Sequence, residues 1–581
     1  MRLQFSRRAQ KKVKHLLGSF APERRYLVGG TTFVVNRQDS AFGIFDGACA
    51  ADYSLKDYAT AATKTFLDIG DGCFDGMHPA IRRFRPRVSS WIPYFYGQTA
   101  AYVFNFPSVQ YGLNNPFVIV ARYVLFSKED KIFDRMQTRV LLPNTMACFS
   151  ALDWSVAAAG RDGRGKLILY VYDPSFRPVT NEFRFFGLYQ SEGLYRCGVH
   201  SWLSAQQDIF KGKKHFAFRC RVPSANSGER YGYCQELFSP LDCVVKRDGP
   251  VGDGAQAGSR HGGTELARAD ELDPVDGAFV FTEGYFVAGD NSGKVARIWH
   301  DNGETQTTHS YPAERYQKDF FIETDFYLPA GGYFAKLVFA DPIGNNILIG
   351  DAITISAFRM AARAPFFSRT VTVGTDQDES RTKFYQLDLR DFCAEMERLA
   401  TDKDEIVQLT VSFKPVGSGI TIGNINDVQV QVYVYSHAGA VCDQYHSAVS
   451  YASLFNPMES PRTNKFGTFV VDDRHVSYVL INNKFPAYMS RTNGGGDRSH
   501  TIRLTMYLPN ELETRTVFLQ TSPERKFYAL NVKDTFNLAN GRAFTGIVHL
   551  FCPTANFWSY YMTMGRAGAD ASLLCDHFTG G

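Results

Sequence analysis

The chain has 581 residues, of which 44% are hydrophobic, 14% aromatic and 21% charged, and its formal net charge is +4. A chain of this length exceeds what a single hydrophobic core serves, so we expect about three or four domains. No stretch reaches the roughly 18 uninterrupted apolar residues of a membrane-spanning helix, and the first 18 residues lack the apolar segment of a signal peptide. These features predict neither a transmembrane segment nor export.

Residues 1–29 form a basic arm in which residues 6–17 are predicted to be a short amphipathic helix. Ser6 is suited to cap its start and Gly18 to end it. Residues 1–25 contain eight Lys or Arg against one Glu, a net charge of +7. Cations on such a helix neutralise phosphates without reading sequence, so we expect Arg7, Arg8, Lys11, Lys12 and Lys14 to contact nucleic acid. An anionic membrane surface suits them less well, because the apolar face is narrow and has no Trp.

After the arm, hydrophobic residues recur with a period of two, which is typical of β-strands. Gly and Pro turns separate many short strands, as in antiparallel β-sandwiches. Three segments are alike and are each expected to be the first strand of a domain: 30–35, 277–281 and 467–471. The predicted organisation is a β-sandwich at 30–177, a β insertion or small extra domain at 178–245, a flexible linker or loop at 246–276, a second sandwich at 277–440, a linker at 441–465, a third sandwich at 466–565 and a C-terminal tail at 566–581.

An internal repeat supports this division. Residues 368–371, followed by 383–391, resemble residues 514–517, followed by 526–534, and a weaker echo occurs at 138–142 and 149–154. The difference in spacing between the copies is of the kind that surface hairpins absorb. One helix is predicted, from Asp388 to Ala400, and its expected buried stripe is Leu389, Phe392, Cys393, Met396 and Leu399. The fold class is therefore all-β, with tandem antiparallel β-sandwich or jelly-roll-like domains and few short helices.

Several groups resemble chemical sites only in part. Asp68, Asp71, Asp75 and His78 could offer oxygen ligands to a cation, but Gly- and Asp-rich segments are usually turns. Cys197 and His200 have the spacing of half a zinc site, for which His215, Cys220, Cys234 and Cys243 are the candidates to complete it, but the second half lacks a matching short pair. We therefore predict no metal and no cofactor. The eleven scattered cysteines indicate free thiols rather than a disulfide framework.

No nucleophile, phosphate-binding or dinucleotide-binding motif is present. Residues 289–293 are expected to be a hairpin turn. The carboxylate pairs Asp376 with Glu379 and Glu395 with Glu397 are interpreted as solvated charge rather than acid and base. The recurring pairs Phe384 with Tyr385 and Phe527 with Tyr528 could stack on bases or sugars, but their place in the repeat favours packing.

The absence of catalytic motifs, the tandem sandwiches and the basic arm together favour a non-enzymatic structural protein. The leading hypothesis is a viral capsid protein, located in the virion or inside the host cell, with an arm directed toward nucleic acid. Its expected partners are copies of itself, with other shell proteins as further candidates. The alternative is an array of carbohydrate-binding β-sandwich modules, for which Trp91, Trp202, Trp299 and Trp558 are the aromatic residues of interest. A glycoside-processing enzyme would need two converging carboxylates, and the sequence selects no such pair.

Overall fold

Up to residue 312, the computed structural model describes only the residues of strands β1 to β22, the first of which begins at residue 23. Beyond them the structure describes residues 322–341, 352–372, 383–413, 419–423, 429–437, 441–447, 449–451, 463–483, 499–509, 514–555, 557–565 and 572–578. The fold is all-β, with antiparallel pairing throughout its sheets. Among the described residues no helix has the length and hydrophobicity needed to cross a bilayer.

Three eight-strand sandwiches make up most of the described chain, and we call them units 1, 2 and 3. Unit 1 consists of β5 (Ser90–Phe95), β6 (Thr99–Phe104), β7 (Phe117–Ser127), β8 (Asp130–Leu141), β9 (Met146–Ser150), β10 (Arg164–Tyr172), β11 (Phe185–Ser191) and β12 (Leu194–His200). Unit 2 consists of β23 (Ile322–Pro329), β24 (Tyr333–Asp341), β25 (Ala352–Phe358), β26 (Phe367–Thr372), β27 (Lys383–Asp388), β28 (Ile406–Phe413), β30 (Gln429–Ser436) and β31 (Val441–Ser447). Unit 3 consists of β33 (Thr463–Val471), β34 (His475–Asn482), β35 (Thr501–Tyr507), β36 (Arg515–Gln520), β37 (Phe527–Asn531), β38 (Phe544–Cys552), β39 (Ser559–Gly565) and β40 (Leu573–His577).

The three units share one topology. Counting strands within a unit, one sheet always has the order first, sixth, third, fourth, and the other has the order eighth, seventh, second, fifth. The repeated segments of the sequence occupy matching positions, because residues 368–371 lie in β26 and 514–517 lead into β36, the two fourth strands. The weaker echo at 138–142 likewise begins in β8, the fourth strand of unit 1. The internal repeat is therefore a repeat of one sandwich fold.

The remaining strands lie before and between these units. A separate four-stranded sheet contains β1 (Glu23–Val28), β2 (Thr31–Asn36), β3 (Ala41–Asp46) and β4 (Cys49–Ser54). Between units 1 and 2 lie β13 (His215–Phe216), β14 (Arg221–Pro223), β15 (Arg230–Phe238), β16 (Val244–Pro250), β17 (Gly263–Glu265), β18 (Glu271–Leu272), β19 (Phe281–Gly289), β20 (Val295–His300), β21 (Glu304–Thr305) and β22 (Thr308–Pro312). Strand β29 (Gly419–Gly423) pairs with β22 in a separate two-stranded sheet, and β32 (Val449–Tyr451) extends unit 2 by pairing with β23.

The units begin and end at other residues than the sequence pattern suggests. Residues 30–35 fall in the separate first sheet and 277–281 lead into β19, whereas 467–471 do lie in the first strand of a unit. Each unit also includes an eighth strand beyond the boundary drawn from the sequence. Thus β12 falls within the segment 178–245, β31 within the segment 441–465 and β40 within the tail 566–581.

The two helices within the described residues follow the fifth strands of units 2 and 3. The predicted helix is present as α6 (Arg390–Leu399), and Leu389 rather than Asp388 is its N-cap residue, although the Asp388 carboxylate accepts a hydrogen bond from the Arg390 amide at 2.9 Å. Four residues of its predicted stripe are buried, but Leu399 is 48% exposed, so its assignment to the core was wrong. Leu399 is the last helical residue, where the chain turns away from the sheet. The equivalent helix in unit 3 is the single turn α8 (Val532–Thr535), capped by the side chain of Asn531.

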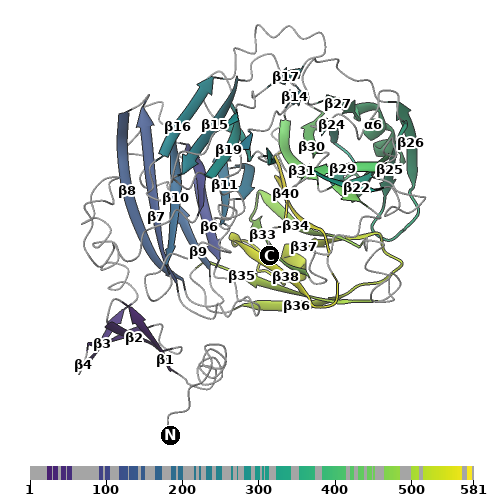
Figure 1. The fold of residues 1–581 in the computed structure, drawn as a ribbon. Helices are drawn as coiled ribbons and strands as arrows, with labels where there is room; N and C mark the ends of the chain where they lie inside the picture. The colour runs from purple at the N-terminus through teal and green to yellow at the C-terminus, as the bar shows by residue number, and fades with distance from the viewer. Residues whose placement is uncertain are drawn as a thin grey trace.

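The eighth strands of all three units meet. Strands β12, β31 and β40 contact one another pairwise, and Figure 1 shows β31 and β40 in the middle of the molecule, between the units. The units also share their cores. One continuous cluster of buried residues runs from unit 2 into unit 3, and a second one contains most of the interior of unit 3 together with Met146, Phe186 and Leu188 of unit 1. Unit 3 is therefore joined to both of its neighbours through buried apolar surface.

Candidate assembly surfaces

The joint between units 1 and 3 is formed by the seventh strand of unit 1 and the first strand of unit 3. Phe186 on β11 meets Phe466 on β33 with ring centroids 5.6 Å apart and the rings nearly perpendicular. The same Phe186 ring lies edge-on to Tyr561 on β39 at 5.8 Å. Edge-to-face rings at this distance add to the stabilisation from burial alone. Since Phe186 has no exposed surface, the joint is desolvated.

The joint between units 2 and 3 uses strands at the equivalent positions, a seventh strand and a first strand. Tyr560 on β39, the seventh strand of unit 3, lies with its ring centroid 5.4 Å from that of Tyr327 on β23, the first strand of unit 2. The Phe527 ring of β37 also lies 5.4 Å from Tyr327. Burial raises the pKa of Tyr327 well above its ordinary value. Unit 1 is thus joined to unit 3, and unit 3 to unit 2, by a seventh strand of one unit placed against the first strand of the other.

Polar groups at the centre of the second joint hold these aromatic rings in place. Asp325 of unit 2 is 4% exposed, and its carboxylate accepts hydrogen bonds from Thr410 Oγ1 at 2.6 Å and from Asn482 Nδ2 of unit 3 at 2.7 Å. Gln408 Nε2 donates to the Tyr327 hydroxyl at 3.0 Å. Buried carboxylates need such donors, because removal from water is costly for a charge. This polar group fixes the relative position of units 2 and 3.

Among the strands that the structure describes, the last ones in one sheet of unit 2 and one sheet of unit 3 have a partner on one side only. Strands β26 and β36 are the last strands of their sheets, and exposure alternates along β26 and most of β36. Hydroxyl pairs connect each to its neighbour: Thr354 with Thr370 at 3.3 Å, Ser356 with Ser368 at 2.9 Å, and Thr505 with Thr516 at 3.2 Å. An unpaired strand edge presents free backbone donors and acceptors, and proteins usually protect it or use it for pairing.

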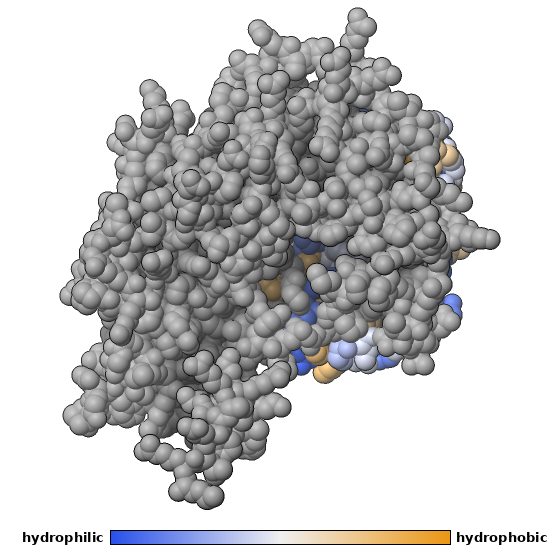
Figure 2. Space-filling view, viewed as in Figure 1, coloured by the Kyte–Doolittle hydropathy of each residue, from blue (hydrophilic) through white to orange (hydrophobic). Residues whose placement is uncertain are grey.

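Strand β36 also presents an exposed apolar side chain. Phe518 is 69% exposed and, with Leu399, is one of two large hydrophobic residues exposed among the described residues. Figure 2 shows hydrophobic and hydrophilic residues side by side along the lower rim of the molecule, where β36 lies in Figure 1. Aromatic residues on an exposed edge are more common at protein interfaces than elsewhere on a surface. The edge at β36 is thus a candidate contact surface.

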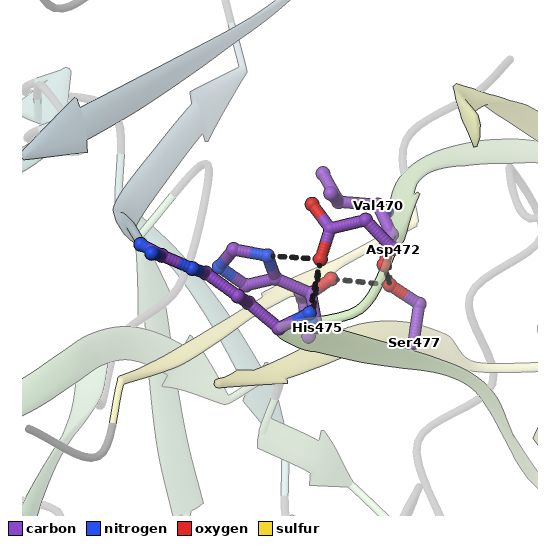
Figure 3. A network of polar contacts seen from close by, with 6 residues as sticks. Val470, Asp472, His475 and Ser477 are labelled. Carbon is purple, nitrogen blue, oxygen red and sulfur yellow. Dashed lines mark hydrogen bonds and ion pairs between the residues drawn. The ribbon is translucent and has the colours of Figure 1, made fainter. Parts of the chain in front are cut away.

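A histidine, an aspartate and a serine lie close together around the turn that connects β33 in one sheet to β34 in the other, and their bonding is structural (Figure 3). Asp472 Oδ1 accepts from the His475 amide at 2.7 Å and lies 2.9 Å from His475 Nδ1. The Ser477 hydroxyl donates to the Val470 carbonyl at 2.6 Å and accepts from the Val470 amide at 2.9 Å. Ser477 is thus directed to the facing strand, whereas a nucleophile would need to meet the imidazole. The aspartate holds a tight turn.

Two carboxylates of α6, those of Glu395 and Glu397, are engaged in ion pairs. Glu397 lies 2.7 Å from Lys403 Nζ and 2.9 Å from His437 Nε2, and these bonds, the one from Lys403 first, lower the pKa of Glu397 to about 2. Glu395 lies 2.5 Å from Arg369 Nη2 on β26. With its pKa this low, the Glu397 carboxylate stays charged at neutral pH and is unsuited to exchanging protons there. The interpretation of this pair as surface charge agrees with these contacts.

The sequence-predicted sites fall into two groups. Arg7, Arg8, Lys11, Lys12 and Lys14 lie outside the described residues, as do the cluster at 68–78, residues 376 and 379, and the turn at 290–293. Cys197 and His200 lie on β12 and residues 384–385 on β27, but their side chains are also outside the described set. Among the side chains that are described, no three His, Cys, Asp or Glu are placed to hold a metal.

The second aromatic pair lies within the described residues. Phe527 and Tyr528 are 0% and 2% exposed, and they face the joint with unit 2 and the core of unit 3, respectively. The packing interpretation is therefore confirmed for this pair. Trp558 lies under Lys465, whose Nζ is 4.5 Å from the ring centroid. Sequence reasoning did not identify the joint residues Asp325, Tyr327 and Asn482, because each occupies an ordinary position in a strand.

Comparisons with known proteins add little to this description. No protein-family model matches the sequence, and the search of the curated proteins found no relative. One solved structure found in the comparison is the C-terminal domain of the Streptococcus pyogenes antigen I/II-family protein AspA. It has 8% sequence identity to this chain and a TM-score of 0.10, over 51% of this chain and 92% of that one. A likeness this weak carries no argument about fold or function.

Proposed function

We propose that the protein is a non-enzymatic structural protein of a virus capsid, built to assemble with copies of itself. The observation that carries the proposal is the use of one sandwich topology three times in a chain, with desolvated joints from seventh strand to first strand. Repeating a single body side by side is an economical way to tile a surface, and closed assemblies are built from repeated interfaces. The proposed location is the virion, or the host cell in which it forms.

Two features support assembly beyond one chain. Strands β26 and β36 have one side without a described strand partner, and Phe518 is exposed on the second of them. We propose that these edges meet other copies of the chain. The histidine, serine and carboxylate groups discussed above are engaged in turns and ion pairs, which favours a structural role over turnover.

Within this proposal the basic arm faces nucleic acid. The cations Arg7, Arg8, Lys11, Lys12 and Lys14 would neutralise phosphates by releasing counterions, independently of base sequence. Replacing all five with Gln should flatten the dependence of nucleic-acid binding on salt. An unchanged dependence would remove the arm from the proposal without affecting the shell.

Assembly is tested by light scattering and negative-stain electron microscopy of the purified full-length chain. We expect large closed particles or their ring-shaped fragments, and we expect Phe518→Lys to reduce their yield, since a lysine on an edge strand opposes pairing. Asn540→Lys adds the same charge at an exposed position outside the strands and should leave the yield unchanged. A chain that stays monomeric at high concentration and is retained on a glycan column would contradict the capsid proposal and favour the carbohydrate-binding alternative.

A further inference from the structure

A group of cations lies where units 2 and 3 meet at the surface. The loop 359–366, between β25 and β26, packs against the turn 521–526, between β36 and β37. Arg363 Nε donates to the Pro523 carbonyl across this boundary, and Met360 Sδ accepts a hydrogen bond from the Ala529 amide at 3.4 Å. We call the four cations of this boundary, Arg359, Arg363, Arg525 and Lys526, the basic seam.

The cations of the basic seam are supported by aromatic rings. Lys526 Nζ of unit 3 lies 4.3 Å from the centre of the Phe358 ring of unit 2. The guanidinium of Arg359 lies 4.8 Å from the Phe366 ring, and that of Arg525 lies 5.5 Å from the Tyr528 ring. Cation–π contacts of this kind restrict a flexible side chain while its charge stays available to a ligand. The seam is therefore partly organised before anything binds.

Its backbone is also fixed. The Asn483 side chain donates hydrogen bonds to the carbonyls of Ser522 at 2.8 Å and of Arg525 at 2.7 Å, which anchors the turn from beneath. The Ser522 amide in turn donates to the Tyr528 hydroxyl. Because the turn is already ordered, binding of a ligand to it costs the protein little additional conformational entropy, which favours affinity.

The seam has more cations than carboxylates. Glu405 lies 3.6 Å from Arg359 Nε, and Glu524 is exposed within the turn. Arg363, Arg525 and Lys526 form no ion pair with any residue that the structure describes. Three cations without a described carboxylate partner, one from unit 2 and two from unit 3, give the seam a net positive charge that favours an anionic ligand.

We propose that the basic seam is a binding site for single-stranded nucleic acid, separate from the arm. Lysine and arginine side chains would contact successive phosphates, and Arg363 and Arg525, both exposed residues, have planar guanidinium groups of the kind on which unpaired bases stack. An acidic polypeptide would form ion pairs with these cations but has no bases to stack on the guanidinium groups, so nucleic acid is the favoured ligand. The seam then identifies the face of the protein that meets the packaged strand, and this last step rests on the proposed capsid function.

The test uses the full-length chain, with the five arm cations replaced by Gln, and a fluorescein-labelled oligouridine. Fluorescence anisotropy over a series of KCl concentrations gives the slope of log K against log salt. The triple variant Arg363→Gln/Arg525→Gln/Lys526→Gln should reduce that slope by about 2, because each lost contact to a single strand removes about 0.7. The single variants Arg363→Gln and Arg525→Gln should each reduce it by about 0.7.

The matched control removes three cations from elsewhere on units 2 and 3. Arg390 and Arg542 also lie over aromatic rings, Phe334 and Phe544, and Lys533 lies in α8. The variant Arg390→Gln/Lys533→Gln/Arg542→Gln should leave the slope unchanged. An unchanged slope in the seam variant, or an equal fall in the control, would overturn the proposal. So would loss of polyglutamate binding in the seam variant with oligouridine binding intact, which would indicate an acidic protein partner. Particle assembly is scored separately, so failure of the capsid proposal remains distinguishable.

Discussion

The hydrogen bond between Asp325 and Asn482 should be one of the strongest single links between units 2 and 3. It joins residues 157 positions apart in the sequence at 2.7 Å, and Asp325 is 4% exposed. Hydrogen bonds to a charged group contribute about 1.5–3 kcal/mol each. We therefore expect Asn482→Ala to reduce the free energy of unfolding by about 2–3 kcal/mol, since the buried carboxylate loses a donor and keeps the one from Thr410.

A double-mutant cycle isolates this link. In an Asp325→Ala background, Asn482→Ala should cost far less, which gives a coupling energy of about 1.5–2 kcal/mol. The assay is urea unfolding followed by tryptophan fluorescence and by circular dichroism, because the continuous core of units 2 and 3 predicts that both unfold in one transition. Thr370→Ala on the exposed strand β26 serves as the control partner and should combine additively with Asp325→Ala within about 0.5 kcal/mol. A coupling no larger than that of the control pair would refute the role of this hydrogen bond in the joint.

Three further predictions follow from individual side chains. Glu397→Gln should lower the midpoint of thermal unfolding at pH 7. The depressed pKa of this carboxyl, due to Lys403 first, stabilises the fold fully above the unfolded-chain pKa of about 4.3, and this stabilisation is lost as the pH falls toward 2. The difference in midpoint between the variant and the wild type should therefore vanish over that range. Burial lowers the folded-state pKa of His549 to about 3, so the neutral imidazole contributes stability to the fold above the unfolded-chain pKa of about 6.5. This contribution should be lost as the pH falls toward 3. His549→Gln should remove that part of the acid sensitivity, and equal pH profiles for both proteins would contradict the assignment. Gly546→Ala should destabilise unit 3 in thermal unfolding, because its Cβ would lie 2.2 Å from the Tyr507 carbonyl oxygen, and an unchanged midpoint would show that the backbone can yield.

Local pattern in the sequence determined the type of structure. Alternating residues predicted strands, and the similarity of 368–371 to 514–517 placed two fourth strands that occupy the same position in their sheets. Exposure alternates along β26 and most of β36, where one face meets water. The helix α6 was also predictable, because its buried stripe recurs with the helical period.

The joints were decided only by tertiary structure. All of β40 except His577 is buried, and the side chains of β39 alternate between the core of unit 3 and the joint with unit 2. A strand covered on both faces has no polar face, so period two disappears from its sequence and the strand reads as a tail or linker. The roles of Asp325 and Asn482 depend on a partner more than a hundred residues away, which no local pattern reports. The sequence thus determined the strands that face water, and packing between the units determined those that do not.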